Sequence, residues 1–350
     1  MLSTSLRSLS TNQTLKRLES LKKIAGITRV ANITRLDYIG IPVFTAFRPN
    51  SKSLTVSQGK GKSINEAKCS AIMESIEVYY AEECLPDIKM KSPNYLSSHS
   101  IPHVRYNSLN PNINMDNEQF SSINWVSCSS FTERGSVLMP YAEFCMNTYL
   151  SEVVIYSPNT TGLASGNSYS EALLHSLLEV IERDESESIY NVLNISNELY
   201  SKVSNLVDIH ITFHKNKFQI PCFEAQIKSK NPFENQVVFI GKGCHLNTNI
   251  ALNRAITEAL QSRLTFISGS RDDISAADYD FQFYEFDIEE SDIEFSSLEY
   301  NKLYDIDYCL NVIKEKMTAM GLDAYTYTYL KKDIVVLKSK IISGNIVSYE

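Results

Sequence analysis

The chain has 350 residues, 43% of them hydrophobic and 21% charged, a composition that predicts a globular protein with a substantial core. Its formal net charge of −8, from 33 basic and 41 acidic residues, argues against general nucleic-acid binding, which depends on Lys and Arg neutralising phosphates. Scattered cysteines without a C-x-x-C pair suggest neither a zinc site nor a disulfide framework, and no apolar run approaches the roughly 18 residues of a membrane span.

The N-terminal segment carries the first predicted element. Residues 14–24 have the apolar periodicity of a short amphipathic helix, and we treat residues 1–25 as an N-terminal helical segment ahead of one domain that covers residues 26–350. The segment is rich in Ser, Leu and Lys, but it has no apolar signal core and no A-x-A site. We therefore expect a cytoplasmic protein.

Strand and helix patterns are mixed along the rest of the chain. The predicted strands lie at residues 41–47, 53–57, 136–141, 221–227 and 236–240. The predicted helices lie at residues 66–83, 170–185, 249–262 and 304–320. The expected fold class is therefore mixed α/β, of the α+β kind. Residues 92–122 are crowded with Ser, Asn and Pro and are expected to form a loop, and the acidic residues 272–299 a solvated or mobile surface segment.

The loop before the first long helix resembles a phosphate-binding loop only in part. It belongs to the stretch GKGKSINEAKCSAIMESIE, residues 59–77. A Walker A loop requires G-x-x-x-x-G-K-[ST], because its first glycine starts the turn whose backbone N–H groups hold the phosphates. Gly61-Lys62-Ser63 supplies the end of that motif, but Val56 occupies the position of the first glycine. The motif is therefore absent.

Three of the four predicted helices, at residues 66–83, 170–185 and 249–262, share a repeated pattern. In two copies a glycine is followed, at identical spacing, by a Glu-Ala pair and then by three polar residues on the helix. The first copy consists of Gly61, Glu66, Ala67, Ser70, Glu74 and Glu77. The second consists of Gly166, Glu171, Ala172, His175, Glu179 and Glu182. The third copy has a longer loop and carries Gly243, Ala251, Arg254, Glu258 and Gln261. We therefore predict three strand-loop-helix units.

Each of these helices has one polar stripe. Positions i, i+4 and i+7 lie within about 40° of each other around a helix and span about 10 Å along it. A solvated face with i, i+4 charge pairs is one explanation, but the glutamates of the first two stripes have few basic neighbours at i±4 and apolar surroundings. Stacked carboxylates become favourable when a hard cation lies between them, and Mg²⁺ is commonly shared between carboxylates and substrate phosphates. The predicted metal ligands are Glu74, Glu77, Glu179 and Glu182.

Basic residues lie where phosphate oxygens would need them. Lys60 precedes the first helix, Arg183 follows the last glutamate of the second, and Arg263 lies near the end of the third. Asn167 and Ser168 stand at the start of the second helix, where helix capping and ligand contact both remain open.

At these residues the sequence resembles the YcaO family. The resemblance covers residues 26–61, the SAIMESIE helix, TGLASGNSYSEALLHSLLEVIERDE (161–185) and ITEALQSRLTFISGSRDD (256–273). YcaO proteins bind ATP and Mg²⁺ in a fold unlike that of P-loop proteins. The resemblance thus implies a single YcaO-type domain with three pseudo-repeated strand-loop-helix units around a nucleotide site.

The resemblance also implies roles for particular residues. The family motif S-x-x-x-E-x-x-E matches residues 70–77 and E-x-x-E-R matches residues 179–183, which makes the four glutamates metal ligands and Arg183 a phosphate contact. His175 stands where other members have serine. Together with Lys60, inferred from charge balance, the expected nucleotide-binding residues are Ser70, Asn167, Glu171, Gln261 and Arg263.

The implied activity is ATP-dependent O-phosphorylation of a peptide backbone amide. A neighbouring Cys, Ser or Thr as nucleophile gives an azoline, and external sulfide gives a thioamide. Azoline-forming members commonly end in a proline-rich tail, whereas this chain has no proline after Pro232. The GITR and RLDYIGIPV segments look like those of members that work with a TfuA-type partner, so thioamide formation is the first expectation and cyclodehydration the alternative.

The partners follow from the same resemblance. We expect a peptide or protein substrate, a TfuA-like or leader-binding partner, a sulfur donor for thioamide formation, and a homodimer, with no nucleic acid and no membrane. Two other classes stay open: a noncatalytic scaffold, which would be expected to have lost its metal carboxylates, and a ligase that activates a free carboxylate.

Overall fold

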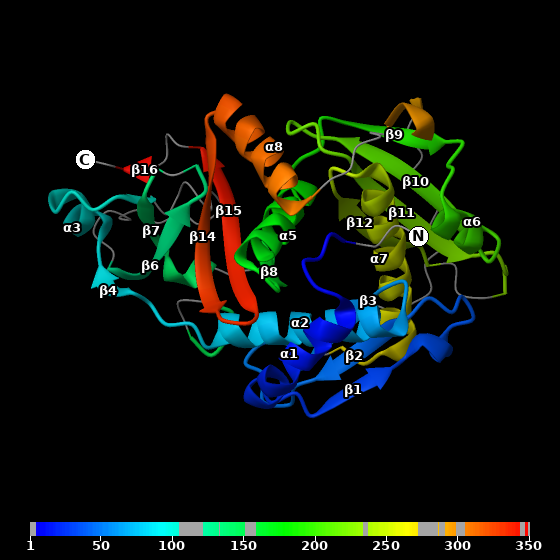
Figure 1. Cartoon of the computed structure of the whole chain (residues 1–350), viewed down its shortest axis with the longest axis horizontal. Coiled ribbons are helices and arrows are strands. Elements are labelled where there is room, and N and C mark those ends of the chain that lie inside the picture. Colours follow the sequence, from blue (N-terminus) through cyan, green and yellow to red (C-terminus); the bar gives the residue numbers. More distant parts are fainter. Residues whose placement is uncertain are drawn as a thin grey trace. The chain divides into compact units, whose positions relative to one another are not determined.

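The computed structural model divides into two compact units (Figure 1). The first unit comprises residues 1–50, 54–75 and 181–309, and the second comprises residues 51–53, 76–180 and 310–350. The structure describes residues 5–104, 122–132, 134–150, 159–233, 237–271, 286, 291–298, 305–343 and 347–348. Within these ranges, no helix combines the length and the apolar character needed to cross a membrane.

A small antiparallel sheet of the first unit carries the loop that precedes helix α2 (Ile64–Glu82). Its strands, in sheet order, are β1 (Arg29–Asn32), β2 (Val43–Phe47) and β3 (Val56–Lys60), and helix α1 (Thr11–Ile24) precedes them in the chain. The register places Val43 opposite Lys60. Phe44 and Ala46 of β2 pack with Ala67 and Ala71 of α2, so the first half of the helix lies against this sheet.

The second sheet of the first unit supports the long helix α7 (Thr248–Ser268). In sheet order its strands are β12 (Phe239–Cys244), β11 (Cys222–Ser229), β10 (Val207–Lys215), β9 (Ser188–Leu193) and β13 (Asp292–Glu294). Asn247 caps the start of α7 by accepting the N–H of Ile250, and Gly269 ends it in a left-handed conformation. The apolar face of α7 packs on this sheet (Figure 1), and helix α6 (Glu198–Ser204) joins the same core.

The second unit is built on a single larger sheet. Its path runs β16 (Val347–Ser348), β5 (His103–Val104), β7 (Ser136–Pro140), β6 (Ile123–Ser130), β14 (Leu322–Lys331), β15 (Val335–Ser343) and β8 (Leu163–Gly166), and β4 (Ile88–Lys91) pairs with β6. The helices of this part are α3 (Pro93–Ser98), α5 (Tyr169–Glu182) and α8 (Ile306–Ala319). Both α5 and α8 extend by a few residues across the division between the units.

Glycines let the helices approach the strands closely. A Cβ on Gly59 would lie 1.9 Å from the backbone nitrogen of Ala71, and one on Gly241 would lie 2.1 Å from that of Ala259. Gly166 stands in the same relation to the start of α5, where a Cβ would meet the Ala172 nitrogen at 2.6 Å. Each of the three long helices therefore lies against a glycine of the strand before it. The threefold repeat itself stays a prediction.

The expected mixed α/β class is confirmed, and several boundaries differ. Strand β3 covers residues 56–60 instead of 53–57, and β12 begins at Phe239 instead of residue 236. Helix α5 ends at Glu182, which leaves Arg183 beyond the helix. The expected loop 92–122 contains α3 and β5, and most of the acidic segment 272–299 lies outside the described residues. The assignment of residues 26–350 to one domain stays a prediction.

Candidate nucleotide-binding site

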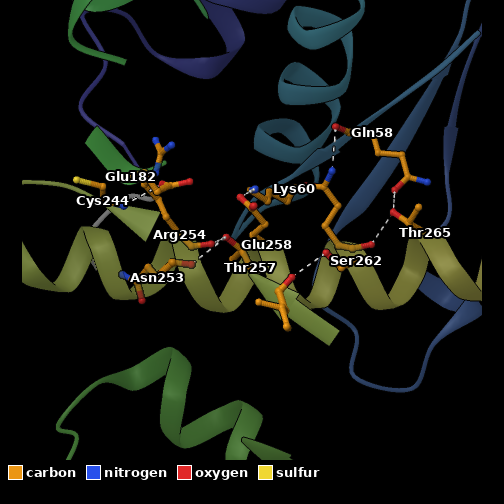
Figure 2. Close-up of polar contacts among 12 residues, drawn as sticks. Gln58, Lys60, Glu182, Cys244, Asn253, Arg254, Thr257, Glu258, Ser262 and Thr265 are labelled. Atoms are coloured by element: carbon orange, nitrogen blue, oxygen red, sulfur yellow. Dashed lines mark hydrogen bonds and ion pairs between the residues drawn. The ribbon is translucent and has the colours of Figure 1, made fainter. Parts of the chain in front are cut away.

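Lys60, Arg183 and Glu258, all singled out by the sequence, meet in one ion-pair cluster of the first unit. Figure 2 shows Lys60 and Glu258 side by side. The Lys60 ammonium at the end of β3 lies 2.5 Å from Oε2 of Glu258, which projects from the middle of α7. The Arg183 guanidinium lies 3.4 Å from Oε1 of the same carboxylate. Counting the neighbouring Arg254 and Glu182, three cations face two carboxylates, so this part of the site retains net positive charge of the kind that binds phosphate.

Glu182 lies beside this cluster and is almost fully buried, with 8% of its surface exposed. Its Oε2 accepts the backbone N–H of Cys244 at 3.0 Å, and its Oε1 lies 3.7 Å from Nε of Arg183. Burial, followed by the negative charge of Glu258, raises the pKa of Glu182, and neighbouring cations oppose the rise. A cation that binds next to such a buried carboxylate stabilises its ionised form. Glu182 therefore has the environment expected of a metal ligand.

Two further polar residues lie near this cluster, Arg254 on α7 and His245 in the loop before α7. Arg254 lies one turn before Glu258. Its positive charge opposes the rise in the pKa of Glu182, and it adds to the effect of Lys60 and Arg183, which lower the pKa of Glu258. His245, in the loop between β12 and α7, is buried, and its Nδ1 accepts the N–H of Asn247 at 2.8 Å. Burial and then Arg254 lower the pKa of His245 to about 3, so this imidazole is neutral in the folded protein.

We expect His245 to make the protein acid-sensitive. The His245 imidazole has a pKa of about 6.5 in the unfolded chain and about 3 in the folded chain. Between these two values only the unfolded chain binds the proton, so the free energy of unfolding decreases as the pH falls from about 6.5 toward 3. Between pH 7.5 and pH 5.0 the wild type should lose about 2 kcal/mol more stability than His245→Asn, which keeps an acceptor for Asn247. Urea unfolding at the two pH values measures this, and equal losses would contradict it.

Gln261, one turn after Glu258 on α7, is held by strand β3. Its side-chain amide donates to the backbone carbonyl of Gln58 at 3.3 Å, and the Thr265 hydroxyl donates to the Gln58 side chain. Gln58 itself is buried. The third stripe thus carries one carboxylate and one amide, whereas the first two stripes carry two carboxylates each.

Arg263 makes a buried ion pair. Its Nε and Nη2 donate to the two carboxylate oxygens of Asp37 at 3.0 and 3.2 Å, and the two side chains are only 8% and 3% exposed. The guanidinium also lies over the rings of Tyr38 and Phe239. A bidentate, enclosed pair of this kind orients Arg263 toward protein groups, and it gives the residue a structural role that the sequence did not indicate.

We expect Asp37→Asn to destabilise the fold by about 3 kcal/mol or more, because it leaves a buried guanidinium without its counter-charge. Glu19→Gln, at an exposed pair in which Lys22 lies 3.3 Å away, should change stability by less than about 1 kcal/mol. Chemical denaturation of both variants measures the two effects. A change below about 1 kcal/mol for Asp37→Asn would show that the buried pair is dispensable.

Two of the predicted nucleotide-binding residues, Asn167 and Glu171, lie at the start of α5 in the second unit. Ser168 accepts the N–H of Glu171 at 3.2 Å, which is the contact of a helix cap. The Asn167 side chain donates to the Glu171 carboxylate at 3.2 Å. The first copy repeats the arrangement, since Ser63 accepts the N–H of Glu66. The capping interpretation of Ser168 is therefore confirmed, and Asn167 and Glu171 contact each other.

The remaining carboxylates are half-buried on α2 and α5. Ser70 and Glu74 lie on α2 in the first unit, and Glu77, whose carboxylate accepts the Ser165 hydroxyl, belongs to the second unit. Glu179 lies on α5. Among the described residues, no group of three or more His, Cys, Asp or Glu side chains is gathered as a metal site. Paired carboxylates are nevertheless the ligand type that Mg²⁺ shares with phosphate oxygens and water, so the donor set fits that ion.

A buried lysine of the second unit was not predicted. Lys338 on β15 donates to the backbone carbonyls of Glu143 and Asn159 at 2.8 and 2.6 Å. Burial and then Lys340 lower the pKa of Lys338 to about 7, while the negative charges of Glu143 and Glu179 oppose this. No sequence signal marked it, because the strand pattern of β15 was not recognised.

Comparison with known proteins identifies the family to which the chain belongs. A family model described as YcaO cyclodehydratase, ATP- and Mg²⁺-binding, matches residues 58–342. The chain therefore belongs to the YcaO family, and ATP and Mg²⁺ are its cofactors.

Two relatives and two solved structures illustrate the likeness. An uncharacterized protein of Mycobacterium tuberculosis is 33% identical over 267 residues, which are 70% of this chain and 58% of that protein. An uncharacterized protein in a tfuA 3′ region of Rhizobium leguminosarum bv. trifolii is 30% identical over 266 residues, 70% of this chain and 63% of the relative. The match thus spans less than two thirds of either relative.

The solved structures share the fold. YcaO from Methanopyrus kandleri, bound with AMPPCP and Mg²⁺, has a TM-score of 0.72 at 17% identity and covers 97% of this chain and 94% of its own. A heterocyclase in complex with substrate and cofactor has a TM-score of 0.69 at 18% identity, with 97% of this chain and 53% of the heterocyclase covered.

Proposed function

We propose that this chain replaces a backbone amide oxygen with sulfur, in an ATP- and Mg²⁺-dependent reaction that makes a thioamide in a ribosomally made peptide or protein. The observation that carries the proposal is its YcaO membership combined with a 30% identical relative in a tfuA 3′ region. The N-terminal GITR and RLDYIGIPV segments agree with the same branch.

The proposed reaction activates the amide by phosphorylation of its oxygen. Hydrosulfide adds to the carbonyl carbon, and the resulting oxyanion attacks the γ-phosphorus of ATP, so that ADP leaves. The carbon–oxygen bond then breaks, phosphate departs with the former amide oxygen, and the carbon–sulfur double bond remains. Amide, HS⁻ and ATP⁴⁻ thus give thioamide, ADP³⁻ and HPO₄²⁻. Most of the required rate enhancement comes from positioning and charge stabilisation.

The residues of the chain divide this work. A bound Mg²⁺ would neutralise negative charge on the phosphates. We assign its binding to Glu74, Glu77, Glu179 and Glu182. Arg183 and Lys60 would contact phosphate, since both are cations held in one cluster. Ser70, Asn167, Glu171, Gln261 and Arg263 are assigned to nucleotide binding, with Arg263 held in place by Asp37.

The partners belong to the proposal as well. A TfuA-like or leader-binding protein would present the peptide or deliver sulfur, and a homodimer in the cytoplasm is the expected setting.

Intact mass spectrometry of candidate peptides tests the proposal directly. The peptides are co-expressed with this chain and the products of its neighbouring genes, with and without Glu182→Gln. A mass gain equal to exchange of one oxygen for one sulfur is expected, and only with the wild type. Loss of one water would instead identify an azoline-forming cyclodehydratase. Modification confined to a free carboxylate would identify a ligase and contradict amide activation.

A further inference from the structure

Two cysteines that are distant in sequence lie together in the second unit. Cys84 follows the end of α2, and Cys145 lies soon after the end of β7. Both are free thiols, and both belong to one buried core cluster. Their side chains are in hydrogen-bond contact with each other. The fold thus forms a dithiol that the spacing of the cysteines along the chain does not indicate.

Hydrogen bonds hold the two cysteine segments against each other. The backbone N–H of Met146 donates to the carbonyl oxygen of Ala81 in α2 at 3.0 Å. The Tyr141 hydroxyl donates to the backbone carbonyl of Cys84, also at 3.0 Å. The Cys84 sulfur itself lies 3.2 Å from the carbonyl oxygen of Ala81. A disulfide between Cys84 and Cys145 would therefore join two segments that the fold already fixes side by side.

The surroundings of Cys145 favour its thiolate. The backbone N–H of Asn147 donates to the Cys145 sulfur at 3.4 Å. Hydrogen bonding to the Cys84 thiol is the largest of the effects that lower the pKa of Cys145 to about 7, and burial opposes it. The positive charge of Lys52 acts in the same direction as these hydrogen bonds. Cys145 is therefore partly ionised near neutral pH, and the thiolate is the nucleophilic form of cysteine.

Cys84 has the opposite character. Its hydrogen bond to Cys145, followed by burial, raises its pKa, so Cys84 keeps its proton. It also lies at the edge of the core, because 9% of its surface is exposed and the next residue, Leu85, is 73% exposed. A small molecule can reach the pair when this surface segment opens locally. An ionised sulfur in contact with a protonated one is the arrangement that yields a disulfide once the first sulfur is oxidised.

We propose that Cys84 and Cys145 form an oxidative modification site whose co-reactant is a peroxide. The Cys145 thiolate attacks one peroxide oxygen and the O–O bond breaks, which gives a sulfenic acid and a hydroxide that takes up the proton released by the thiol. The Cys84 sulfur then attacks the sulfenic sulfur, the S–O bond breaks, and water leaves with the Cys84 proton. Two thiols and H₂O₂ thus give one disulfide and two waters, with sulfur oxidised and the peroxide reduced.

A second pair of facing thiols provides an internal control. Cys222 and Cys244 lie opposite each other across β11 and β12, and their side chains are also in hydrogen-bond contact. Here burial, followed by the contact with Cys222, raises the pKa of Cys244, and the negative charge of Glu182 adds to the rise. Both pairs bring two sulfurs together, but the surroundings of Cys145 lower a thiol pKa and those of Cys244 raise one.

The reduced full-length chain is exposed to hydrogen peroxide, quenched at intervals with N-ethylmaleimide in denaturant, and digested for mass spectrometry of linked peptides. We expect a cross-link between Cys84 and Cys145 that forms at least about tenfold faster than one between Cys222 and Cys244, because the thiolate fraction sets the rate of the first step. Dithiothreitol should remove the cross-link. Absence of a link between Cys84 and Cys145, or equal rates for the two pairs, overturns the proposal.

Two variants test the order of the steps. In Cys84→Ser the second thiol is absent but a hydroxyl donor remains beside Cys145, so sulfenic acid should accumulate at Cys145 and be trapped there by dimedone. In Cys145→Ser, Cys84 should stay a thiol under the same treatment. Dimedone labelling of Cys84 as fast as that of Cys145 would contradict the assignment of Cys145 as the attacking thiol. The cross-link in the wild type decides the proposal even if a variant fails to fold.

Discussion

Replacing Glu182 with glutamine should reduce the rate of ATP-dependent peptide modification by at least about a hundredfold. Losses of this size are typical when one group that stabilises charge in the transition state is removed. The fold should survive, because the glutamine oxygen can still accept the N–H of Cys244. Burial and the nearby Glu258 already raise the pKa of Glu182, so removing its charge relieves a desolvation cost. Glu74→Gln is expected to lose activity in the same way.

The measurement compares Mg²⁺-dependent AMPPCP binding and peptide modification in both variants. Glu185→Gln, an exposed acid three residues further along the chain, provides the matched substitution and should retain wild-type values. Wild-type modification by a soluble Glu182→Gln would remove the residue from the set of metal ligands. Loss of activity in the Glu185 variant would show that the effect is not specific to the site.

Gly59→Ala should destabilise the first unit by about 4 kcal/mol or more, a size reserved for severe backbone or core conflicts. A Cβ at Gly59 would lie 1.9 Å from the Ala71 nitrogen and 2.4 Å from the Ala67 carbonyl oxygen. Both contacts are to the backbone of α2, so no side-chain rotation relieves them. The helix would have to move away from β3, and the stripe of α2 would move with it.

Gly26→Ala is the control for this substitution. Gly26 has φ of 69°, and a Cβ there would meet no atom within 4 Å, so the variant should cost only the about 1–2 kcal/mol of a left-handed alanine. Urea unfolding and soluble yield compare the two variants. Equal stability of Gly59→Ala and Gly26→Ala would contradict the close packing of strand and helix.

The long helices could be predicted from sequence because their periodicity is strong. The expected helices at 66–83 and 249–262 correspond to α2 and α7, whose apolar faces pack on sheets. The helix start expected at Asn167 and Ser168 is also present in the structure, where Ser168 accepts the N–H of Glu171. Local patterns of this kind need no knowledge of distant contacts.

Strands and ion-pair partners could not be predicted in the same way. β14 and β15 pair over most of their length, but their sequences mix polar and apolar residues on buried positions, so alternation is weak. The partner of Arg263 is Asp37, far away in the chain, and nothing near either residue indicates the other. The link between Lys60 and Glu258 likewise exists only through the packing of α7 beside β3.

The fate of the amide oxygen tests the central claim most directly. The peptide that changes mass is prepared with ¹⁸O in the modified backbone amide, and the phosphate released from ATP is analysed by mass spectrometry. Phosphorylation of the amide oxygen predicts one ¹⁸O atom in each phosphate released per modification. Unlabelled phosphate from a peptide that is fully modified would show that ATP cleavage does not pass through the amide oxygen, and would contradict the proposed activation.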